Sequence, residues 1–221
     1  MMNILTEQLV RIPVTQGHIE GMLELPGNAQ GIVLFAHGSG SSRHSPRNNF
    51  VAGVLRAGGF GTLLMDLLTP QEDAVYETRF DIALLTRRLL SATLWLQENR
   101  SSHNLPLGYF GASTGAAAAL QAAALLGREI GAVVSRGGRP DMAGGHDLQK
   151  VECPTLLLVG GRDDVVIELN REAYAQLRCE KQLSIVPGAT HLFEEPGTLD
   201  EVARQASAWF NRYLRSAPAA R

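Results

Sequence analysis

The chain has 221 residues, of which 45% are hydrophobic, with 23 glycines and 10 prolines; this composition is ordinary for a globular protein and excludes collagen-like and disordered chains. Its 20 Lys and Arg residues against 22 Asp and Glu residues give a net charge of −2, which argues against nucleic acid or an anionic membrane as the main partner. The length favours a single domain over residues 1–221, with residues 216–221 as a frayed tail and a small molecule as its partner.

The cysteine content and the N-terminus indicate the cellular compartment of the protein. Cys153 and Cys179 are too few for a disulfide framework, and no Cys or His spacing typical of a metal site occurs, so we expect reduced thiols and no cofactor. The first ten residues lack the basic and apolar stretches of a secretory signal, and nowhere do 18 apolar residues follow one another. These features predict a cytoplasmic protein with no membrane partner, and they leave the oligomeric state open.

The first elements in chain order are two strands. Residues 9–14 and 19–25 alternate apolar and polar side chains around a short polar turn, a pattern that predicts an antiparallel hairpin with one solvated face. The later runs are short and almost wholly apolar, as in parallel strands covered on both faces; they comprise residues 31–36, 62–65, 105–110, 132–134, 155–159 and 184–186.

Helical spacing appears between and after these runs. Apolar residues recur with that spacing at Leu85, Leu89, Ala92 and Leu96, and again through residues 199–213. Thr198 and Glu201 have the spacing of a capping box at the start of the last helix. Strands that alternate with helices after an N-terminal hairpin predict a three-layer α/β domain, with helices on both faces of a mostly parallel sheet.

One motif follows the run at residues 105–110. It reads Gly111-Ala-Ser-Thr-Gly115 and precedes an alanine-rich stretch, so a G-x-S-x-G sequence lies between a predicted strand and a predicted helix. Such a turn exposes the serine at the carboxyl edge of the sheet, and bulk at the flanking glycines would collide with neighbouring backbone. We interpret Ser113 as a nucleophile; the alternative is a purely structural tight turn.

A serine nucleophile needs a base and an acid that orients the base. His191 follows the last predicted strand, which favours it as the base over a solvated loop histidine. Asp163 and Asp164 follow residues 155–159; Asp163 is the preferred acid, because Asp164 is nearer the next helix, and Asp141 is a weaker candidate. The order Ser113, Asp163, His191 is typical of one α/β architecture.

Backbone amides would have to stabilise the developing oxyanion. The amide of Thr114 follows the nucleophile at a helix N-terminus, and a second donor is expected in the loop after residues 31–36. Ser39 is our choice for that donor. His37 is expected to hold this loop by hydrogen bonding rather than to act as a base.

Four stretches together carry a resemblance to a known family. Residues 31–40 (GIVLFAHGSG), 111–115 (GASTG), 159–163 (VGGRD) and 188–191 (GATH) stand in the order found in α/β-hydrolases, and the compact length resembles the dienelactone hydrolase branch. The resemblance spans nearly the whole chain. It implies an α/β-hydrolase fold and a Ser-His-Asp triad of Ser113, His191 and Asp163.

The chain departs from the well-known dienelactone hydrolases at the nucleophile, where they have a cysteine. Ser113 in this place favours a serine esterase or lactonase that forms an acyl-enzyme. The longest candidate for a lid is the segment of residues 67–78, so we expect a minimal cap or none and a small, soluble ester or lactone as substrate. An amide or peptide hydrolase with the same triad, and a non-catalytic scaffold that binds a ligand, remain alternatives.

Four arginines follow two of the predicted strands. Arg43 and Arg47 come after residues 31–36, and Arg136 and Arg139 come after residues 132–134. Paired guanidinium groups in these loops suit a carboxylate or phosphate on the substrate. Salt bridges that only support the loops are the alternative.

Overall fold

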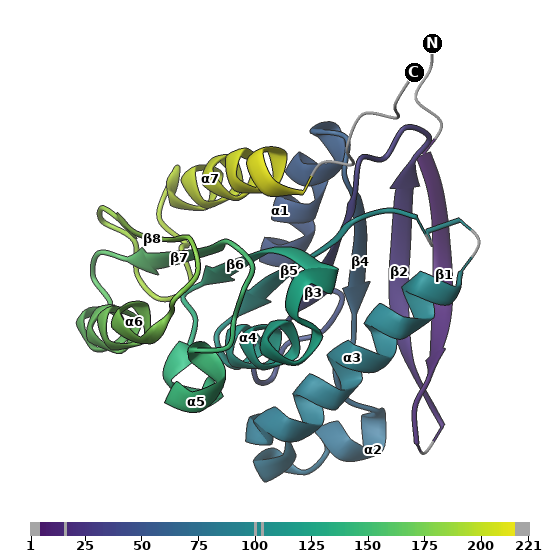
Figure 1. Cartoon of the computed structure of the whole chain (residues 1–221), viewed down its shortest axis with the longest axis horizontal. Helices are drawn as coiled ribbons and strands as arrows, with labels where there is room; N and C mark the ends of the chain where they lie inside the picture. Colours follow the sequence, from purple (N-terminus) through teal and green to yellow (C-terminus); the bar gives the residue numbers. More distant parts are fainter. Residues whose placement is uncertain (1–4, 16, 100, 103, 215–221) are drawn as a thin grey trace.

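The computed structural model describes residues 5–15, 17–99, 101–102 and 104–214. In these residues an eight-stranded sheet forms the centre, in the order β1-β2-β4-β3-β5-β6-β7-β8 (Figure 1). The strands are β1 (Leu5–Pro13), β2 (His18–Pro26), β3 (Ile32–Ala36), β4 (Gly61–Met65), β5 (Leu107–Ala112), β6 (Ile130–Arg136), β7 (Thr155–Gly160) and β8 (Lys181–Val186). This order confirms the predicted mostly parallel sheet with an antiparallel N-terminal hairpin.

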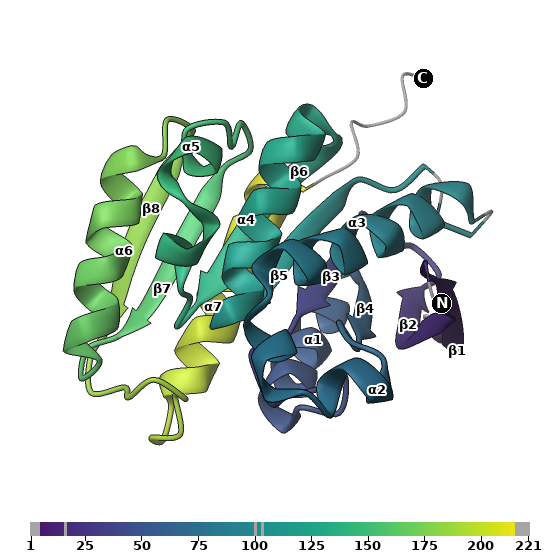
Figure 2. The ribbon, with the colours of Figure 1, turned by 90° about the horizontal axis from the view of Figure 1, so that it is seen from below.

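Helices cover both faces of the sheet. The helices are α1 (Pro46–Ala57), α2 (Pro70–Asp73), α3 (Ile82–Glu98), α4 (Thr114–Leu126), α5 (Gly145–Leu148), α6 (Asp164–Gln176) and α7 (Thr198–Tyr213), with 3₁₀ turns at Tyr76–Phe80, Gly127–Glu129 and Pro140–Ala143. Figure 2 shows α3, α4 and α6 in front of the sheet and α1 and α7 behind it. The chain therefore has three layers.

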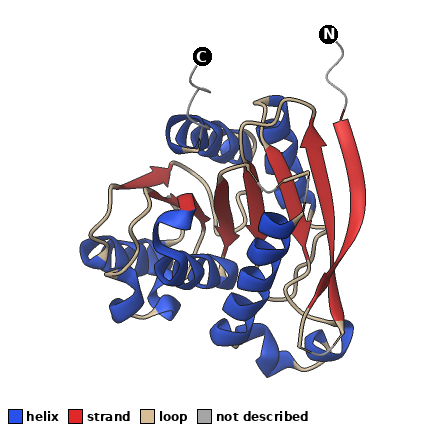
Figure 3. Ribbon diagram, turned by 45° about the vertical axis from the view of Figure 1, so that its right-hand side comes forward, coloured by secondary structure: helices blue, strands red, loops and turns tan. Residues whose placement is uncertain are grey.

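The N-terminal hairpin lies at one end of the strand order, with β1 as the edge strand of the sheet (Figure 3). Strand β1 pairs antiparallel with β2, from Leu5 opposite Pro26 to Pro13 opposite His18, and β2 pairs antiparallel with β4. The remaining neighbours are parallel. The predicted hairpin is confirmed, although β1 begins at Leu5 rather than at residue 9, because backbone pairing continues where the apolar alternation stops.

Apolar side chains pack on both faces of the strands. One cluster joins the sheet to α3 and α4, and the other joins it to α1 and α7. Strands β3, β4, β5 and β7 are buried along their whole length, which explains why their sequences are apolar runs rather than alternating ones. Because the parallel strands β3 to β8 point the same way, the loops after them meet at one edge of the sheet.

The structure differs from the sequence prediction at the start of the last helix. The predicted capping box at Thr198 is wrong. Gly197 precedes α7 in a left-handed conformation, and the Thr198 hydroxyl donates to Glu195 O at 2.7 Å instead of accepting the Glu201 N–H. The Gly197 backbone already makes the turn into the helix, so α7 starts without a side-chain cap. The predicted tail at residues 216–221 lies outside the described residues. Among the residues described, none of the helices is both long and apolar enough to traverse a membrane.

Candidate active site

Ser113 lies on a sharp turn between β5 and α4. Its backbone has φ 51° and ψ −122°, a left-handed conformation that costs a non-glycine residue about 1–3 kcal/mol and is found mainly at functional sites. The turn works only with small neighbours: a Cβ on Gly111 would lie 2.5 Å from Ala116 Cα, and a Cβ on Gly115 would lie 2.1 Å from Ala36 O. The geometry is that of a nucleophile elbow.

His191 and Asp163 contact each other across two neighbouring loops. The loop after β7 carries Asp163 and the loop after β8 carries His191, and the Arg162 N–H bonds Ala189 O at 2.9 Å to hold the loops together. His191 Nδ1 lies 2.6 Å from Asp163 Oδ2. A carboxylate on Nδ1–H leaves Nε2 as the proton acceptor of the ring. Asp164 is exposed in the first turn of α6, and of the two carboxylates it is Asp163 that contacts His191.

The segment of residues 136–139 contacts both the elbow and the histidine loop. Ser113 N–H donates to Arg136 O at 3.4 Å, and Arg139 N–H donates to Ser113 O at 3.0 Å. Gly137, with φ 50°, approaches the histidine so closely that an added Cβ would lie 3.6 Å from His191 Cε1. The structure thus brings Ser113, His191 and Asp163 to the same carboxyl edge of the sheet.

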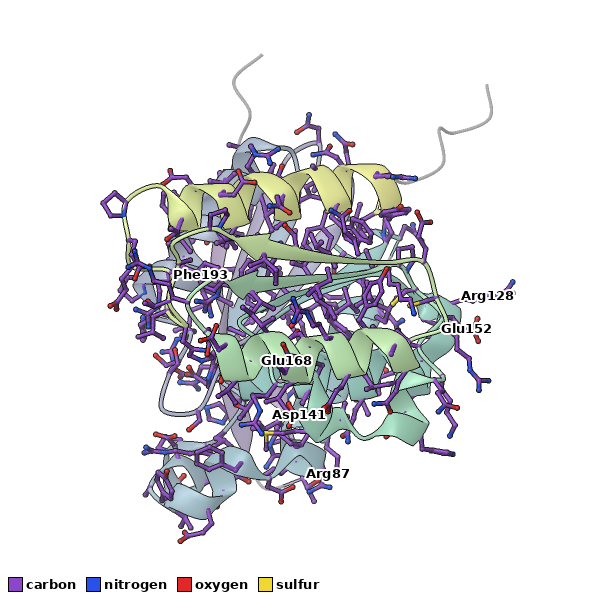
Figure 4. The ribbon with its side chains drawn as sticks, turned by 90° about the vertical axis from the view of Figure 1, so that its left-hand side faces the viewer. Arg87, Arg128, Asp141, Glu152, Glu168 and Phe193 are labelled. Carbon is purple, nitrogen blue, oxygen red and sulfur yellow. The ribbon has the colours of Figure 1, made fainter. Side chains whose placement is uncertain are left out.

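The loop that carries His191 is internally fixed. The Glu195 carboxylate accepts the Thr190 N–H at 3.0 Å, and this hydrogen bond lowers the pKa of Glu195. Phe193 adopts φ 56° while its side chain is only 1% exposed, and Figure 4 shows it in the loop between β8 and α7. A buried ring in a strained backbone conformation anchors the loop two residues after the histidine.

His37 fixes the loop after β3. Its Nδ1–H donates to Gly38 O at 2.9 Å, and its Nε2 accepts the Leu67 N–H at 3.0 Å. Both ring nitrogens are therefore used, and the ring must be neutral to accept from Leu67. Burial lowers the pKa of His37, in line with this state. As expected from the sequence, His37 holds the loop against the end of β4.

The two expected oxyanion donors lie beside each other. Thr114 begins α4, where the first amides of the helix have no intrahelical acceptor. The Ser39 N–H donates to Thr114 Oγ1 at 3.0 Å. The structure thus places both residues at the elbow, but it gives the Ser39 amide an acceptor that sequence reasoning did not anticipate. No sequence signal identifies this bond, because it joins residues 75 positions apart.

The four arginines fall into two groups. Arg43 pairs with Asp66 and with Glu20, the latter at 2.8 Å, and Arg139 pairs with Asp141 at 2.8 Å. Their charges are met within the protein, so for these two the loop-supporting alternative describes the geometry better than a substrate contact does.

Arg47 and Arg136 lie together on the α1 side of the sheet. Arg47 contacts Glu194 at 3.1 Å, and Arg136 NH2 donates to Asn48 Oδ1 at 3.3 Å. Sequence reasoning missed Asn48 and Phe193 as neighbours of these arginines. The Ser45-Pro46 pair is a helix-start signal that would have located α1 and hence Asn48. Phe193 carries no comparable signal.

Two cavities adjoin the loop after β3. One, of about 240 Å³, is lined by His37, Ser41, Ser42, Asp66, Leu68, Pro70 and Asp73. The other, of about 380 Å³, shares Asp66, Leu68 and Pro70 with it and extends toward the β1–β2 turn. The segment of residues 67–78, expected to be the longest lid candidate, supplies part of both walls through α2. Within the described ranges, no three His, Cys, Asp or Glu side chains gather closely enough to hold a metal ion.

Comparison with known proteins adds the family. The model of the dienelactone hydrolase family matches residues 20–215. The crystal structure of a dienelactone hydrolase from Anabaena variabilis is 53% identical, covers 96% of this chain and 99% of that chain, and superposes with a TM-score of 0.93. Est1E from Butyrivibrio proteoclasticus shares the fold at 15% identity, with a TM-score of 0.79 over 92% of this chain and 98% of that chain.

A curated relative is a Mycobacterium tuberculosis protein provisionally named as a phosphoribosyl transferase. It is 56% identical over 207 residues, which are 94% of this chain but 46% of that protein. The chain thus spans about half the length of this relative. Because the family model covers residues 20–215 and the Anabaena structure agrees over almost its full length, the chain belongs to the dienelactone hydrolase family.

Proposed function

We propose that this chain is a serine hydrolase that cleaves small carboxylic esters or lactones through an acyl-enzyme on Ser113. The observation that carries the proposal is the 2.6 Å contact between His191 Nδ1 and Asp163 Oδ2 at the edge where Ser113 occupies its strained turn. An imidazole oriented by a carboxylate, at the same edge of the sheet as a partly exposed serine, is the arrangement that activates a hydroxyl group. Membership of the dienelactone hydrolase family supports the same chemistry.

The proposed reaction has two stages, acylation of Ser113 and hydrolysis of the acyl-enzyme. Ser113 Oγ attacks the ester carbonyl carbon while its proton passes to His191 Nε2, and collapse of the tetrahedral intermediate breaks the bond to the leaving oxygen, which takes that proton. Water then attacks the acyl-enzyme, again giving a proton to Nε2, and Ser113 recovers it as the acid leaves. For a lactone, acid and alcohol are released as one hydroxy acid. Asp163 holds the imidazole in the tautomer with Nε2 free and stabilises its charged form.

The oxyanion of the intermediate would be bound by two amides. Thr114 N–H at the start of α4 is one donor, and Ser39 N–H is the other. In the structure the Ser39 amide bonds Thr114 Oγ1, so we propose that it turns to, or is shared with, the oxyanion when this forms. The Thr114 hydroxyl then keeps the amide in place before substrate arrives.

The space beside the loop favours a small substrate. The cavity of about 240 Å³ next to His37 and Leu68 is smaller than the usual sites for drug-sized ligands. We propose that a short acyl or alcohol group occupies it. The phosphoribosyl transferase name of the mycobacterial relative describes a chain about twice as long, and no described contact in the site favours that transfer.

A substrate panel tests the proposal. We expect wild-type protein to hydrolyse p-nitrophenyl acetate and butyrate and to open γ-butyrolactone, and Ser113→Ala to lose these activities by several orders of magnitude while its circular dichroism spectrum stays unchanged. Preference for p-nitroacetanilide over the matched ester would indicate an amide hydrolase instead. No turnover of any panel member by folded wild-type protein would favour a non-catalytic scaffold.

A further inference from the structure

Asn170 is a buried polar residue in the middle of helix α6. Its side chain is 0% exposed, and its Nδ2 donates to Gly138 O at 3.0 Å and to Val166 O at 2.8 Å. Because both partners are carbonyl oxygens, the amide must present its nitrogen to them and acts there only as a donor. One bond stays within the helix, and the other reaches the loop after β6, 32 positions away in the sequence.

The oxygen of this amide has no partner among the described residues. Asn170 Oδ1 is buried and accepts no hydrogen bond from them, while the other buried residues of α6 are apolar, namely Val166, Ile167 and Ala173. An unsatisfied buried oxygen weakens a folded state, and an apolar side chain of the same size would avoid that cost. Packing alone therefore does not explain an amide at this position, and its long-range contribution is the bond to Gly138 O.

Gly138 belongs to the segment of residues 136–139, which clamps the nucleophile elbow. Arg136 O accepts the Ser113 N–H at 3.4 Å, and the Arg139 N–H donates to Ser113 O at 3.0 Å. Both backbone polar groups of Ser113 are thus bound by residues on either side of Gly138. Ser113 has φ 51°, and a strained conformation of this kind persists only where its surroundings hold it. The segment is one of the constraints that keep the elbow in shape.

Little space remains around this segment. A Cβ on Gly138 would lie 2.0 Å from Ser135 Oγ and 2.6 Å from Ala116 Cβ in α4. A Cβ on Gly137 would lie 3.0 Å from His191 O. Closely packed interiors transmit strain, so a shift of Gly138 would reach both the elbow and the loop that carries the histidine.

Helix α6 also follows the acid of the proposed triad. Asp163 occupies the position before the first helical residue, and Asn170 lies about two turns further along the same helix. Helices α6 and α4 cover the same face of the sheet (Figure 2), and α4 begins directly after Ser113. The bond from Asn170 to Gly138 O therefore ties the helix that starts at the acid to the segment that clamps the nucleophile.

We propose that Asn170 is a positioning residue for the hydrolysis. Its Nδ2 fixes Gly138 O and thereby holds the segment of residues 136–139, and with it Ser113, in place relative to His191. The inference rests on the proposed function and adds a residue that acts through a backbone carbonyl rather than on the substrate. A displacement of about 1 Å between reacting groups costs on the order of a hundredfold in rate, so loss of this bond should appear in kcat.

Two substitutions of Asn170 test the proposal. Asn170→Leu keeps nearly the same size and removes the donor, so we expect kcat for p-nitrophenyl butyrate to fall at least about tenfold while KM stays within about twofold. In Asn170→Ser the hydroxyl bonds the carbonyl four residues earlier in the helix, which keeps a partner for Val166 O but not for Gly138 O. The serine variant should therefore lose as much kcat, and it keeps the inference falsifiable if Asn170→Leu does not fold.

Gln121→Met is the matched control. Gln121 lies about two turns along α4 from the elbow, and its Nε2 donates to Ala143 O at 3.1 Å, so it also binds a carbonyl of the loop after β6 through a side-chain amide. This variant should lower the Tm and leave kcat unchanged at temperatures well below the Tm. The inference is overturned if Asn170→Leu likewise lowers only the Tm, or if Gln121→Met loses as much kcat as Asn170→Leu does.

Amide hydrogen exchange tests the clamp without relying on turnover. The Arg139 N–H, which donates to Ser113 O, should exchange about tenfold faster in Asn170→Leu and Asn170→Ser than in the wild type, and at the wild-type rate in Gln121→Met. NMR spectroscopy measures this amide individually. Unchanged exchange would overturn the inference even if the protein hydrolyses esters. Faster exchange in a protein that hydrolyses no ester would instead refute the proposed function and leave the hold of Asn170 on the segment standing.

Discussion

The backbone amide of Ser39 donates a hydrogen bond to the hydroxyl of Thr114, with 3.0 Å between Ser39 N and Thr114 Oγ1. Thr114 is 3% exposed and follows Ser113 directly, so one residue supplies both a candidate oxyanion donor and the acceptor that orients the other donor. The loop after β3 and the start of α4 are thereby linked before any substrate binds. Such preorganisation is what a strong oxyanion hole requires.

Removing the Thr114 hydroxyl tests this link. Thr114→Val keeps the shape of the side chain and removes the acceptor, so the Ser39 amide loses its fixed direction, and we expect kcat/KM for p-nitrophenyl butyrate to fall about tenfold. Thr114→Ser, which keeps the acceptor, should restore most of the rate. A boronic acid that mimics the tetrahedral intermediate should lose affinity in parallel. Equal rates in the valine variant and the wild type would show that the hydroxyl does not position the amide.

The acid of the triad can be assigned by two amide substitutions. Asp163→Asn should lower kcat by about 10⁴, because an amide favours the wrong tautomer of His191. Asp164→Asn is the matched control: it changes the neighbouring carboxylate, which is exposed in α6, and should change kcat by less than about twofold. Steady-state kinetics on one ester ranks the two variants. The opposite ranking would transfer the orienting role to Asp164.

Burial of His37 predicts a pH dependence of folding. Burial lowers the pKa of His37 below its ordinary value, so the unfolded chain binds more protons than the folded one as the pH falls below about 6.5. The stabilising contribution is complete above that pH and is lost progressively as the pH falls toward the lowered pKa, with a slope of at most about 1.4 kcal/mol per pH unit.

Urea denaturation between pH 7.5 and 5.5 measures this dependence. His37→Gln keeps an acceptor for the Leu67 N–H and cannot titrate, so the free energy of unfolding of this variant should fall less in acid than that of the wild type. Parallel curves for the two proteins would mean that His37 does not titrate differently in the folded and unfolded states.

The close packing around Gly115 predicts that a larger side chain at this position destabilises the fold. A Cβ at this position would lie 2.1 Å from Ala36 O and 2.5 Å from His37 O, and both obstacles are backbone atoms, so Gly115→Ala should destabilise the fold by about 3 kcal/mol. Gly53→Ala in α1 is the control, since the added Cβ would meet nothing closer than 3.9 Å. This substitution should stabilise the helix by about 1 kcal/mol. Thermal melts of both variants give the comparison. A Gly115→Ala protein as stable as wild type would contradict the close packing of α4 on β3.

The parts of the fold and site that the sequence predicts are those governed by local patterns. Apolar runs identified the parallel strands, and G-x-S-x-G placed Ser113 between β5 and α4, because strand, turn and helix signals are adjacent in the chain. The structure places Asp163 in contact with His191 and Asp164 in the helix that follows; which of the two is the acid stays a prediction.

The features that escaped prediction depend on long-range contacts or on the local conformation of the backbone. Arg43 is neutralised by Asp66 and Glu20, whereas Arg136 lacks a carboxylate partner among the described residues, and nothing local in the sequence distinguishes these two arginines. The Thr198 capping box has the right spacing, but Gly197 makes the turn by itself and the Thr198 hydroxyl bonds Glu195 O. Contacts between distant segments decide the arginine case, and the local backbone conformation at Gly197 decides the capping case; the spacing of residues reports neither.

The most direct test of the account is covalent labelling of Ser113 with a fluorophosphonate. The probe's phosphorus should bond to Ser113 Oγ with loss of fluoride, because in the proposed mechanism the His191–Asp163 pair activates this hydroxyl above all other serines. Intact-mass and peptide mass spectrometry of folded wild-type protein should show one adduct, on the peptide that contains Ser113, together with loss of esterase activity; Ser113→Ala should remain unlabelled. Two outcomes would contradict the assignment of Ser113 as the nucleophile. One is wild-type protein that hydrolyses esters but does not react with the probe, and the other is an adduct on a different residue.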